Sequence, residues 1–199
     1  RKFNLDGEFK SMPDFEEAKN FPRDCENLKS FPVSRLGPFL FTSLEPEFNI
    51  KKIFDEIANR LSFFKFEKLV ERPDLTSEHI VKANWAIYCE NYLDPFHIPF
   101  VHKELTSVLD INQYKTEIYD NYNLQIGYSK DDEDSFEIPE GSKDFGKKIS
   151  AYYYWIFPNL MLNFYPWGLS INVITPINKN RTKVSFIQFM LDESKYDLG

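Results

Sequence analysis

The sequence predicts an α+β domain, in which helices come before an antiparallel β-sheet. An amphipathic helix and a second helical segment lie in the first half of the chain, and closely spaced β-rich segments fill the second half. Helices and strands that occur in separate blocks favour an α+β fold over an alternating α/β fold. The 199 residues, 42% of them apolar, are enough for one domain with a sizeable core.

The first 45 residues have the pattern of short strands and turns. Asp-Gly between two apolar-alternating segments is a strong hairpin signal, because both residues tolerate the turn's backbone. This stretch is too small to form a domain by itself. The two predicted hairpins are residues 3–10, turning at Asp6-Gly7, and residues 33–44, turning at Gly37-Pro38.

Residues 49–62 predict an amphipathic helix. Apolar side chains recur there at steps of three and four residues, and Asn49 is a suitable N-cap. Residues 64–71 and 79–83 are predicted strands that follow it.

Six further strands are predicted in a row near the end of the chain. Short spacing and tight turns indicate an antiparallel meander. The turn signals are Asp120-Asn121, Pro158-Asn159, Pro166-Trp167-Gly168 and Asn178-Lys179-Asn180. The predicted strands are residues 114–119, 123–128, 151–157, 160–165, 169–175 and 182–191.

Residues 84–102 stand out because they combine a helical pattern with metal-binding side chains. Asn84 is a plausible N-cap. One face of the predicted helix is apolar. The opposite face carries Glu90, Asn91, Asp94 and His97 instead of the Lys and Arg of an ordinary solvated face. The apolar face consists of Trp85, Tyr88, Cys89, Tyr92 and Phe96.

His102 follows His97 by five residues, which is too far for pairing one turn apart on a regular helix. Pro95 and Pro99 also disturb a helix, because proline lacks the N–H and clashes with a carbonyl one turn back. A widened turn or a helix end could bring the two imidazoles together. The plainer alternative is a surface helix with two unrelated histidines.

The whole pattern resembles the mononuclear-iron motif of the Rieske-type non-haem iron oxygenases, the family of ring-hydroxylating oxygenase α-subunits. The resemblance is carried by Asn-Trp, then Glu-Asn, then Asp, then His-x4-His. The variant Glu-Asn-Tyr-Leu-Asp-x-x-His-x-Pro-Phe-x-His is most similar to the branch that includes choline monooxygenase. The matching residues are Asn84, Glu90, Asn91, Asp94, His97 and His102.

The resemblance implies a role for each matching residue. His97 and His102 would be ligands of Fe(II), and two histidines plus one carboxylate on one face of the metal leave positions open for oxygen and substrate. Asp94 would orient a ligand histidine and connect it to a cluster on a neighbouring subunit, and its alternative is a helix cap before Pro95. Glu90 and Asn91 would be supporting or pocket residues. Asn84 is expected to be structural, and His79 to be non-catalytic.

The same resemblance predicts two parts of a longer protein. Residues 1–45 would be the C-terminal remnant of a Rieske domain, and residues 46–199 a helix-grip catalytic domain truncated at its C-terminus. The two Cys and two His that hold a Rieske cluster are not in this sequence, so we expect them before Arg1. The third iron ligand is expected after Gly199. A solvated tail is the expected role of the nearby Asp192, Glu193 and Asp197.

The implied reaction is the O2-dependent hydroxylation or oxidative demethylation of a small organic molecule. The cofactors would be mononuclear Fe(II) and a Rieske [2Fe-2S] cluster, and the partners a reductase or ferredoxin within a homotrimer. An aromatic lining, for which residues 157–168 are one candidate and an ordinary hairpin the alternative, suits a quaternary amine or an arene. The competing function is a non-catalytic helix-grip domain that binds a small apolar ligand.

Composition excludes several other classes of protein. A net charge of −7 argues against binding to nucleic acids or anionic membranes. No apolar run approaches the roughly 18 residues of a membrane span, and no signal peptide is visible. Cys25 and Cys89 have neither zinc nor disulfide spacing, so a reducing cytoplasm is the expected compartment.

Overall fold

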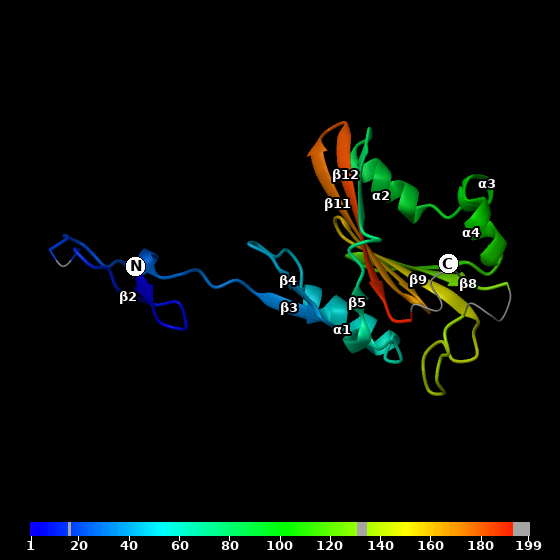
Figure 1. Cartoon of the computed structure of the whole chain (residues 1–199), viewed down its shortest axis with the longest axis horizontal. Helices are drawn as coiled ribbons and strands as arrows, with labels where there is room; N and C mark the ends of the chain where they lie inside the picture. The colour runs from blue at the N-terminus through cyan, green and yellow to red at the C-terminus, as the bar shows by residue number, and fades with distance from the viewer. Residues whose placement is uncertain (16, 131–134, 193–199) are drawn as a thin grey trace. The chain divides into compact units, whose positions relative to one another are not determined.

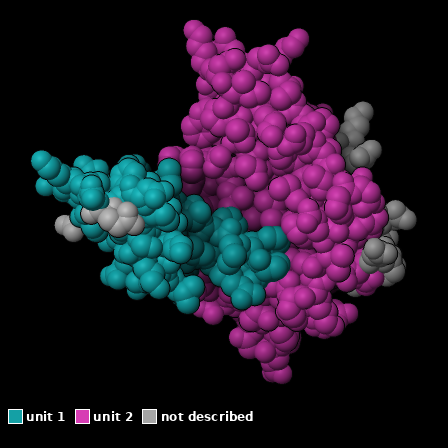
Figure 2. All heavy atoms as spheres, turned by 60° about the vertical axis from the view of Figure 1, so that its left-hand side comes forward, with its two compact units in different colours: residues 1–51 teal, residues 52–199 magenta. Residues whose placement is uncertain are grey.

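The computed structural model describes residues 1–15, 17–130 and 135–192, and the chain forms two compact units (Figures 1 and 2). Residues 1–51 make the first unit and residues 52–199 the second. Each unit has its own secondary structure, and the site analysed below lies in the second.

The first unit contains both of the hairpins that the sequence predicts. Gly7 and Gly37 adopt positive φ angles of 88° and 55° at the two turns, as tight turns require. The sequence patterns did not indicate the short 3₁₀ helix η1. The strands are β1 (Lys2–Phe3), β2 (Phe9–Ser11), β3 (Val33–Leu36) and β4 (Phe39–Thr42), and η1 is Asp24–Glu26.

An eight-stranded antiparallel sheet is the centre of the second unit. The strands β7 to β12 pair in chain order, which confirms the predicted meander, and β5 and β6 both pair with β12. The strands are β5 (Val70–Glu71), β6 (Ser77–Val81), β7 (Lys115–Ile118), β8 (Tyr122–Tyr128), β9 (Ile149–Ile156), β10 (Leu160–Tyr165), β11 (Gly168–Asn178) and β12 (Arg181–Met190).

Helices cover both faces of this sheet, so its central strands are buried on both sides (Figure 1). Side chains alternate between the faces along a strand. On one face, Arg60 at the end of α1 lies over the Tyr152 ring. On the other, Cys89 of α2 packs in a cluster with Met161, and Trp155 packs against that cluster. The helices are α1 (Ile50–Arg60), η2 (Phe66–Lys68), α2 (Trp85–Leu93), α3 (Ile98–Val101) and α4 (Lys103–Val108).

Two sequence predictions about secondary structure are wrong. Residues 64–71 form η2 and only the two-residue strand β5, because Phe64 and Phe66 pack edge-on against each other and against Phe164 instead of alternating between faces. The helix predicted to start at Asn84 extends only to Leu93, so Phe96 and His97 lie beyond it, and α4 was not anticipated. The α+β class itself is confirmed.

Candidate functional site

The helix α2 begins where the sequence predicts. Asn84 accepts a hydrogen bond from the backbone N–H of Ala86 at 3.0 Å, which satisfies one of the free donors at the helix start. Its amide also donates to the carbonyl oxygen of Lys179 at 2.9 Å, in the β11–β12 turn. The expected structural role of Asn84 is therefore confirmed, and the start of α2 is fixed to the sheet.

The helix ends early because of Pro95. A residue before proline is restricted to extended conformations, and Asp94 has φ −92° and ψ 108°. Phe96, predicted on the apolar helix face, lies beyond the helix and is 83% exposed. Asp94 and His97 consequently lie in the turn after α2, not on its polar face.

This break in the helix brings the two histidines together. The ring centroids of His97 and His102 are 5.1 Å apart, with the rings at 68° to each other. The short helix α3 between them is a single turn: Val101 N–H donates to the carbonyl of His97, and His102 N–H donates to the carbonyl of Ile98. Ile98 is buried and holds this turn against the protein. The two histidines, five residues apart in sequence, are therefore neighbours in space.

Asp94 lies beside the histidine pair, and each of its two carboxylate oxygens faces a different group. Its Oδ1 accepts a hydrogen bond from the backbone N–H of Phe96 at 2.9 Å, so it caps the turn after Pro95. Its Oδ2 lies 3.7 Å from Nδ1 of His97, about 0.8 Å more than the usual N–H···O distance. The capping hydrogen bond is therefore formed, and the carboxylate would have to move only about 0.8 Å closer to hydrogen-bond with His97.

The other predicted residues lie apart from this arrangement. Glu90 and Asn91 are exposed on α2. His79 lies in β6, as the strand pattern predicted, where its ring packs edge-on against Phe186. Asp192 is described, whereas Glu193 and Asp197 lie outside the described residues.

The histidine pair fits a metal ion in part. Nδ1 of His97 is buried and has no hydrogen-bond partner among the described residues, an unusual state for a buried polar atom. A neutral imidazole is a common metal ligand, and an imidazole whose Nδ1 donates to a carboxylate presents Nε2 to the metal. Within residues 1–15, 17–130 and 135–192, no three His, Cys, Asp or Glu side chains are grouped closely enough to hold a metal. The described residues thus bring two imidazoles together and place no third candidate ligand beside them.

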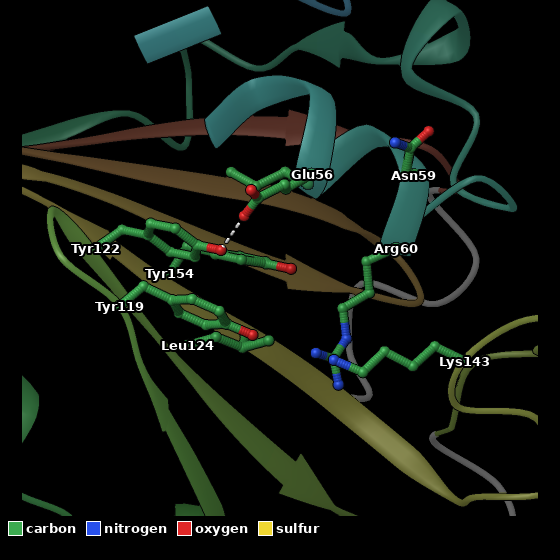
Figure 3. Close-up of a pocket in the computed structure, with 9 residues that line it drawn as sticks. Glu56, Asn59, Arg60, Tyr119, Tyr122, Leu124, Lys143 and Tyr154 are labelled. Atoms are coloured by element: carbon green, nitrogen blue, oxygen red, sulfur yellow. Dashed lines mark hydrogen bonds between the residues drawn. The ribbon is translucent and has the colours of Figure 1, made fainter. Parts of the chain in front are cut away.

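A hollow of about 360 Å³ lies on the face of the sheet that α1 covers (Figure 3). Its wall includes the stacked rings of Tyr119 and Tyr122, 4.3 Å apart, and Glu56, which accepts a hydrogen bond from the Tyr122 hydroxyl. The histidine pair does not line this hollow. The hollow thus has aromatic walls on the opposite face of the sheet from α2, and residues 157–168, the candidate lining, do not contribute to it.

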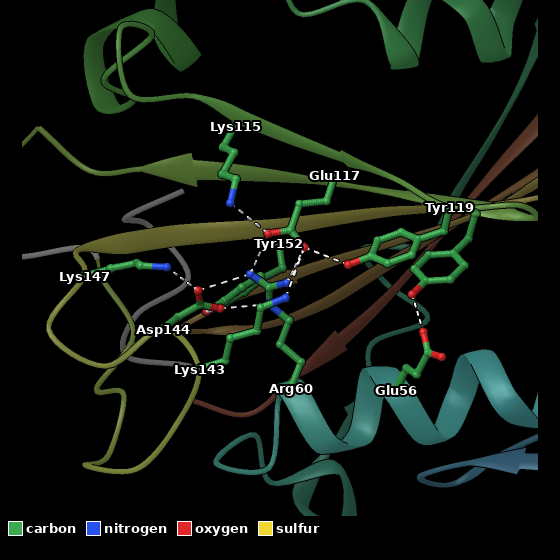
Figure 4. Close-up of polar contacts among 10 residues, drawn as sticks. Glu56, Arg60, Lys115, Glu117, Tyr119, Lys143, Asp144, Lys147 and Tyr152 are labelled. Carbon is green, nitrogen blue, oxygen red and sulfur yellow. Dashed lines mark hydrogen bonds and ion pairs between the residues drawn. The ribbon is translucent and has the colours of Figure 1, made fainter.

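Next to the hollow, Arg60 joins α1 to the sheet (Figure 4). Its guanidinium donates to Glu117 at 2.6 Å and to Asp144 at 2.8 Å. Burial alone would raise the pKa of Glu117, but the hydrogen bonds from Arg60 and Tyr119 hold that pKa well below its usual range. We regard these contacts as structural, because the charges of Arg60, Glu117 and Asp144 are paired with one another.

The residues that support the histidine segment were missed at the sequence level. Gln125 and Asn163 are buried amides in β8 and β10, and both bond to Tyr92 of α2. The available signal was a polar residue inside an otherwise apolar strand. It could not reveal the partner, which lies more than 30 residues away.

The fold and the site together define an antiparallel α+β domain that carries a close histidine pair at the end of a sheet-packed helix. Residues 66–195 match the model of the ring hydroxylating alpha subunit (catalytic domain). The chain belongs to this family of oxygenases.

Curated relatives agree with this membership. The chain is 37% identical over 124 residues to choline monooxygenase, chloroplastic, of Arabidopsis thaliana, covering 60% of this chain and 27% of that protein. It is 25% identical over 201 residues to the carnitine monooxygenase oxygenase subunit of Escherichia coli, covering 98% of this chain and 52% of that protein. The chain thus spans between about a quarter and a half of the length of these relatives.

Solved structures share the fold. A quaternary ammonium Rieske monooxygenase in complex with L-carnitine gives a TM-score of 0.66 at 15% identity, over 98% of this chain and 52% of the other. Naphthalene 1,2-dioxygenase from Rhodococcus, bound to indole, gives 0.62 at 16% identity, over 98% and 53%. In the described part of the chain, no helix is both long and apolar enough to cross a membrane.

Proposed function

We propose that this chain is the catalytic part of a Rieske-type oxygenase that hydroxylates or oxidatively demethylates a small organic substrate with O2. The observation that carries the proposal is the His97–His102 pair, 5.1 Å apart with Asp94 beside it, in a chain of this family. His97 and His102 would hold Fe(II), which when bound supplies the O2-activating redox chemistry.

The protein's own contribution is to place and orient these ligands. The turn after Pro95 and the short helix α3 bring both rings within 5.1 Å of each other. Asp94 would accept a hydrogen bond from Nδ1–H of His97, which fixes the tautomer and raises the basicity of the ligand nitrogen. Since Asp94 is 45% exposed, it can also face a second group from outside the domain. Connecting the iron site to a Rieske cluster on a neighbouring subunit is the role that we propose for it.

We propose a quaternary ammonium compound as the substrate class. Relatives named for choline and carnitine, and a quaternary ammonium Rieske monooxygenase among the similar folds, support this choice. Aromatic substrates remain the alternative, supported by the fold likeness to naphthalene 1,2-dioxygenase. A reductase or ferredoxin would supply electrons.

The remaining proposals concern the rest of the protein. Residues 1–45 would be the end of a Rieske domain whose [2Fe-2S] cluster is held elsewhere, and residues 46–199 a helix-grip catalytic domain. A homotrimer would place one subunit's cluster near the next subunit's iron. The cytoplasm is the expected location, and the chloroplast is the alternative, since the choline monooxygenase relatives are named chloroplastic.

One observation favours the competing function of a non-catalytic binding domain. The described residues hold two imidazoles and no third ligand, so the metal site is incomplete within them. A binding domain of this kind would hold no iron at His97 and His102.

Dependence on O2 separates the two functions. Holoprotein with its electron donors should convert carnitine or choline only when O2 is present, with O2 uptake that rises on addition of substrate, as an oxygen electrode and mass spectrometry measure. His97→Ala should abolish the product, and His79→Ala should retain it. Product formed without O2, or equal product from His97→Ala, would refute the oxygenase assignment.

A further inference from the structure

We propose that Gln125 is a positioning residue for the histidine pair: its buried amide holds the end of α2 from which the segment carrying His97 and His102 departs. This inference deepens the proposed function and rests on it. Gln125 touches neither ring, so it would act only through the helix end.

The carbonyl oxygen of Tyr92 lacks its usual hydrogen-bond partner within the helix. The last carbonyls of a helix have no partner within it. In a continuing helix, Tyr92 C=O would accept from the N–H of Phe96, but that N–H donates to Asp94. Gln125 Nε2 donates to the oxygen of Tyr92 instead, at 2.9 Å. The carbonyl two residues before Asp94 is thereby fixed to strand β8.

The amide of Gln125 is itself held in one orientation. The hydroxyl of Tyr114 donates to its Oε1 at 3.0 Å, which leaves the nitrogen to face Tyr92. Burial raises the pKa of Tyr114, so this phenol stays protonated and remains a donor. Gln125 is 1% exposed, and a buried amide is costly unless both of its groups are bonded. Here both are.

A second contact strengthens the same helix end. The hydroxyl of Tyr92 donates to Oδ1 of Asn163 at 2.7 Å, and the amide of Asn163 donates to the carbonyl of Ser170 at 3.1 Å. The last turn of α2 is therefore attached to β8 through its backbone and to β10 through its side chain.

The other end of the histidine segment returns to the same strand. Leu109 forms a bridge with Ser129, and Asp110 N–H donates to the carbonyl of Tyr128 at 2.8 Å. Tyr128 is the last residue of β8, so residues 94–108 are held at both ends by one strand. Movement at the Gln125 end would change where His97 lies relative to His102.

The test compares two substitutions of the same kind. Gln125→Met keeps the side-chain volume and removes the donor to Tyr92. Gln188→Met is the control, because Gln188 lies in β12 and donates to the hydroxyl of Ser170 at 3.0 Å, whereas Asn163 donates to the carbonyl of Ser170. Deuterium exchange of the backbone amides of residues 94–108 is the first measurement. Binding of Co²⁺, followed by broadening of the imidazole NMR signals, is the second.

We expect amides in residues 94–108 to exchange at least about tenfold faster in Gln125→Met, with residues 151–165 unchanged. The Kd for Co²⁺ should rise roughly 10- to 100-fold, as for other groups that orient metal ligands. Gln188→Met should leave both measurements near wild type. Unchanged exchange in Gln125→Met, or equal acceleration in Gln188→Met, would overturn the proposal.

Two further outcomes are decisive. If Gln125→Met does not fold, Tyr114→Phe tests the same chain of bonds, because it frees the amide to turn, and it should accelerate exchange in residues 94–108 alone. Wild-type exchange there would refute the role of Gln125. If Co²⁺ binding does not depend on His97 or His102, the iron site fails, while the exchange comparison still decides whether Gln125 positions the segment.

Discussion

At the scale of single residues, residue types and spacing in the sequence pointed to the candidate site. Asn84 was correctly predicted as a cap because a cap depends on its immediate neighbours. The closeness of His97 and His102 was only one of two alternatives, since it depends on where the helix ends. Gln125 could not be found, because its function comes from a partner in α2, 33 residues away in sequence.

Asp94→Asn separates the capping contact of this residue from its carboxylate. Asn can still accept the hydrogen bond from Phe96 N–H, so the turn should persist and the metal content should stay near wild type. Product formed in a single turnover should fall roughly 10- to 100-fold, because the orienting carboxylate is gone. The rate of Rieske cluster oxidation in the holoprotein is the accompanying measurement.

Asp110→Asn is the matched control for that substitution. Asp110 caps Asn112 N–H at 3.0 Å in the same local geometry but lies after α4. It should leave turnover unchanged. Cluster oxidation at the wild-type rate in Asp94→Asn would mean that Asp94 serves only as a cap.

At the scale of elements, the meander was predictable because each strand is a short apolar run bounded by a turn. The errors occur where tertiary contacts or proline override a pattern. Aromatic packing around Phe164 turns residues 66–68 into a 3₁₀ helix. Pro95 ends α2 at Leu93, before Phe96 and His97, which the sequence pattern placed on the helix faces. The contact of α1 with the sheet through Arg60 was not anticipated, because its carboxylates lie 57 and 84 residues away.

Arg60→Met should lower the free energy of unfolding by roughly 3 kcal/mol, because removing one partner leaves buried carboxylates poorly compensated. The side chains of Arg60, Glu117 and Asp144 are 7%, 13% and 1% exposed. Lys143→Met, at an exposed side chain, should change stability by less than about 0.5 kcal/mol. Urea unfolding measures both, and equal effects would contradict a structural role for Arg60.

The same contact predicts a dependence on pH. The folded-state pKa of Glu117 is depressed, so its stabilisation is present above its unfolded pKa of about 4.3 and is lost as pH falls below that value. Wild-type stability should therefore decline below about pH 4. Arg60→Met should show a shallower decline. Parallel curves for the two proteins would exclude the contribution of Glu117.

Gly168→Ala should disrupt the β11–β12 pairing. A Cβ at Gly168 would lie 2.1 Å from the carbonyl oxygen of Phe189, which is backbone and cannot move aside. We expect a loss of more than 3 kcal/mol in unfolding free energy, since overpacking against backbone is costly. Gly141→Ala meets no neighbour within 4 Å and should lose only about 1 kcal/mol through its positive φ. A smaller loss at Gly168 than at Gly141 would contradict this packing.

At the scale of the whole molecule, one sheet serves two different purposes. Its α1 face is held by aromatic packing and the Arg60 ion pairs, whereas its α2 face holds the helix that ends at the histidine pair. Family membership follows from residues 66–195. The fold class and the family motif could be predicted from the sequence because local patterns encode them. Which helix packs on which face of the sheet could be seen only in the tertiary structure.

The central claim is that His97 and His102 together hold a metal ion. The chain has three histidines, so Co²⁺ titration followed by NMR of the imidazole C–H signals can assign the site directly. We predict weak binding, because the described residues supply no third ligand, with paramagnetic broadening of His97 and His102 before His79. His97→Ala and His102→Ala should each abolish the effect, and His79→Ala should leave it intact. Broadening centred on His79, or binding unchanged in His97→Ala, would contradict the account.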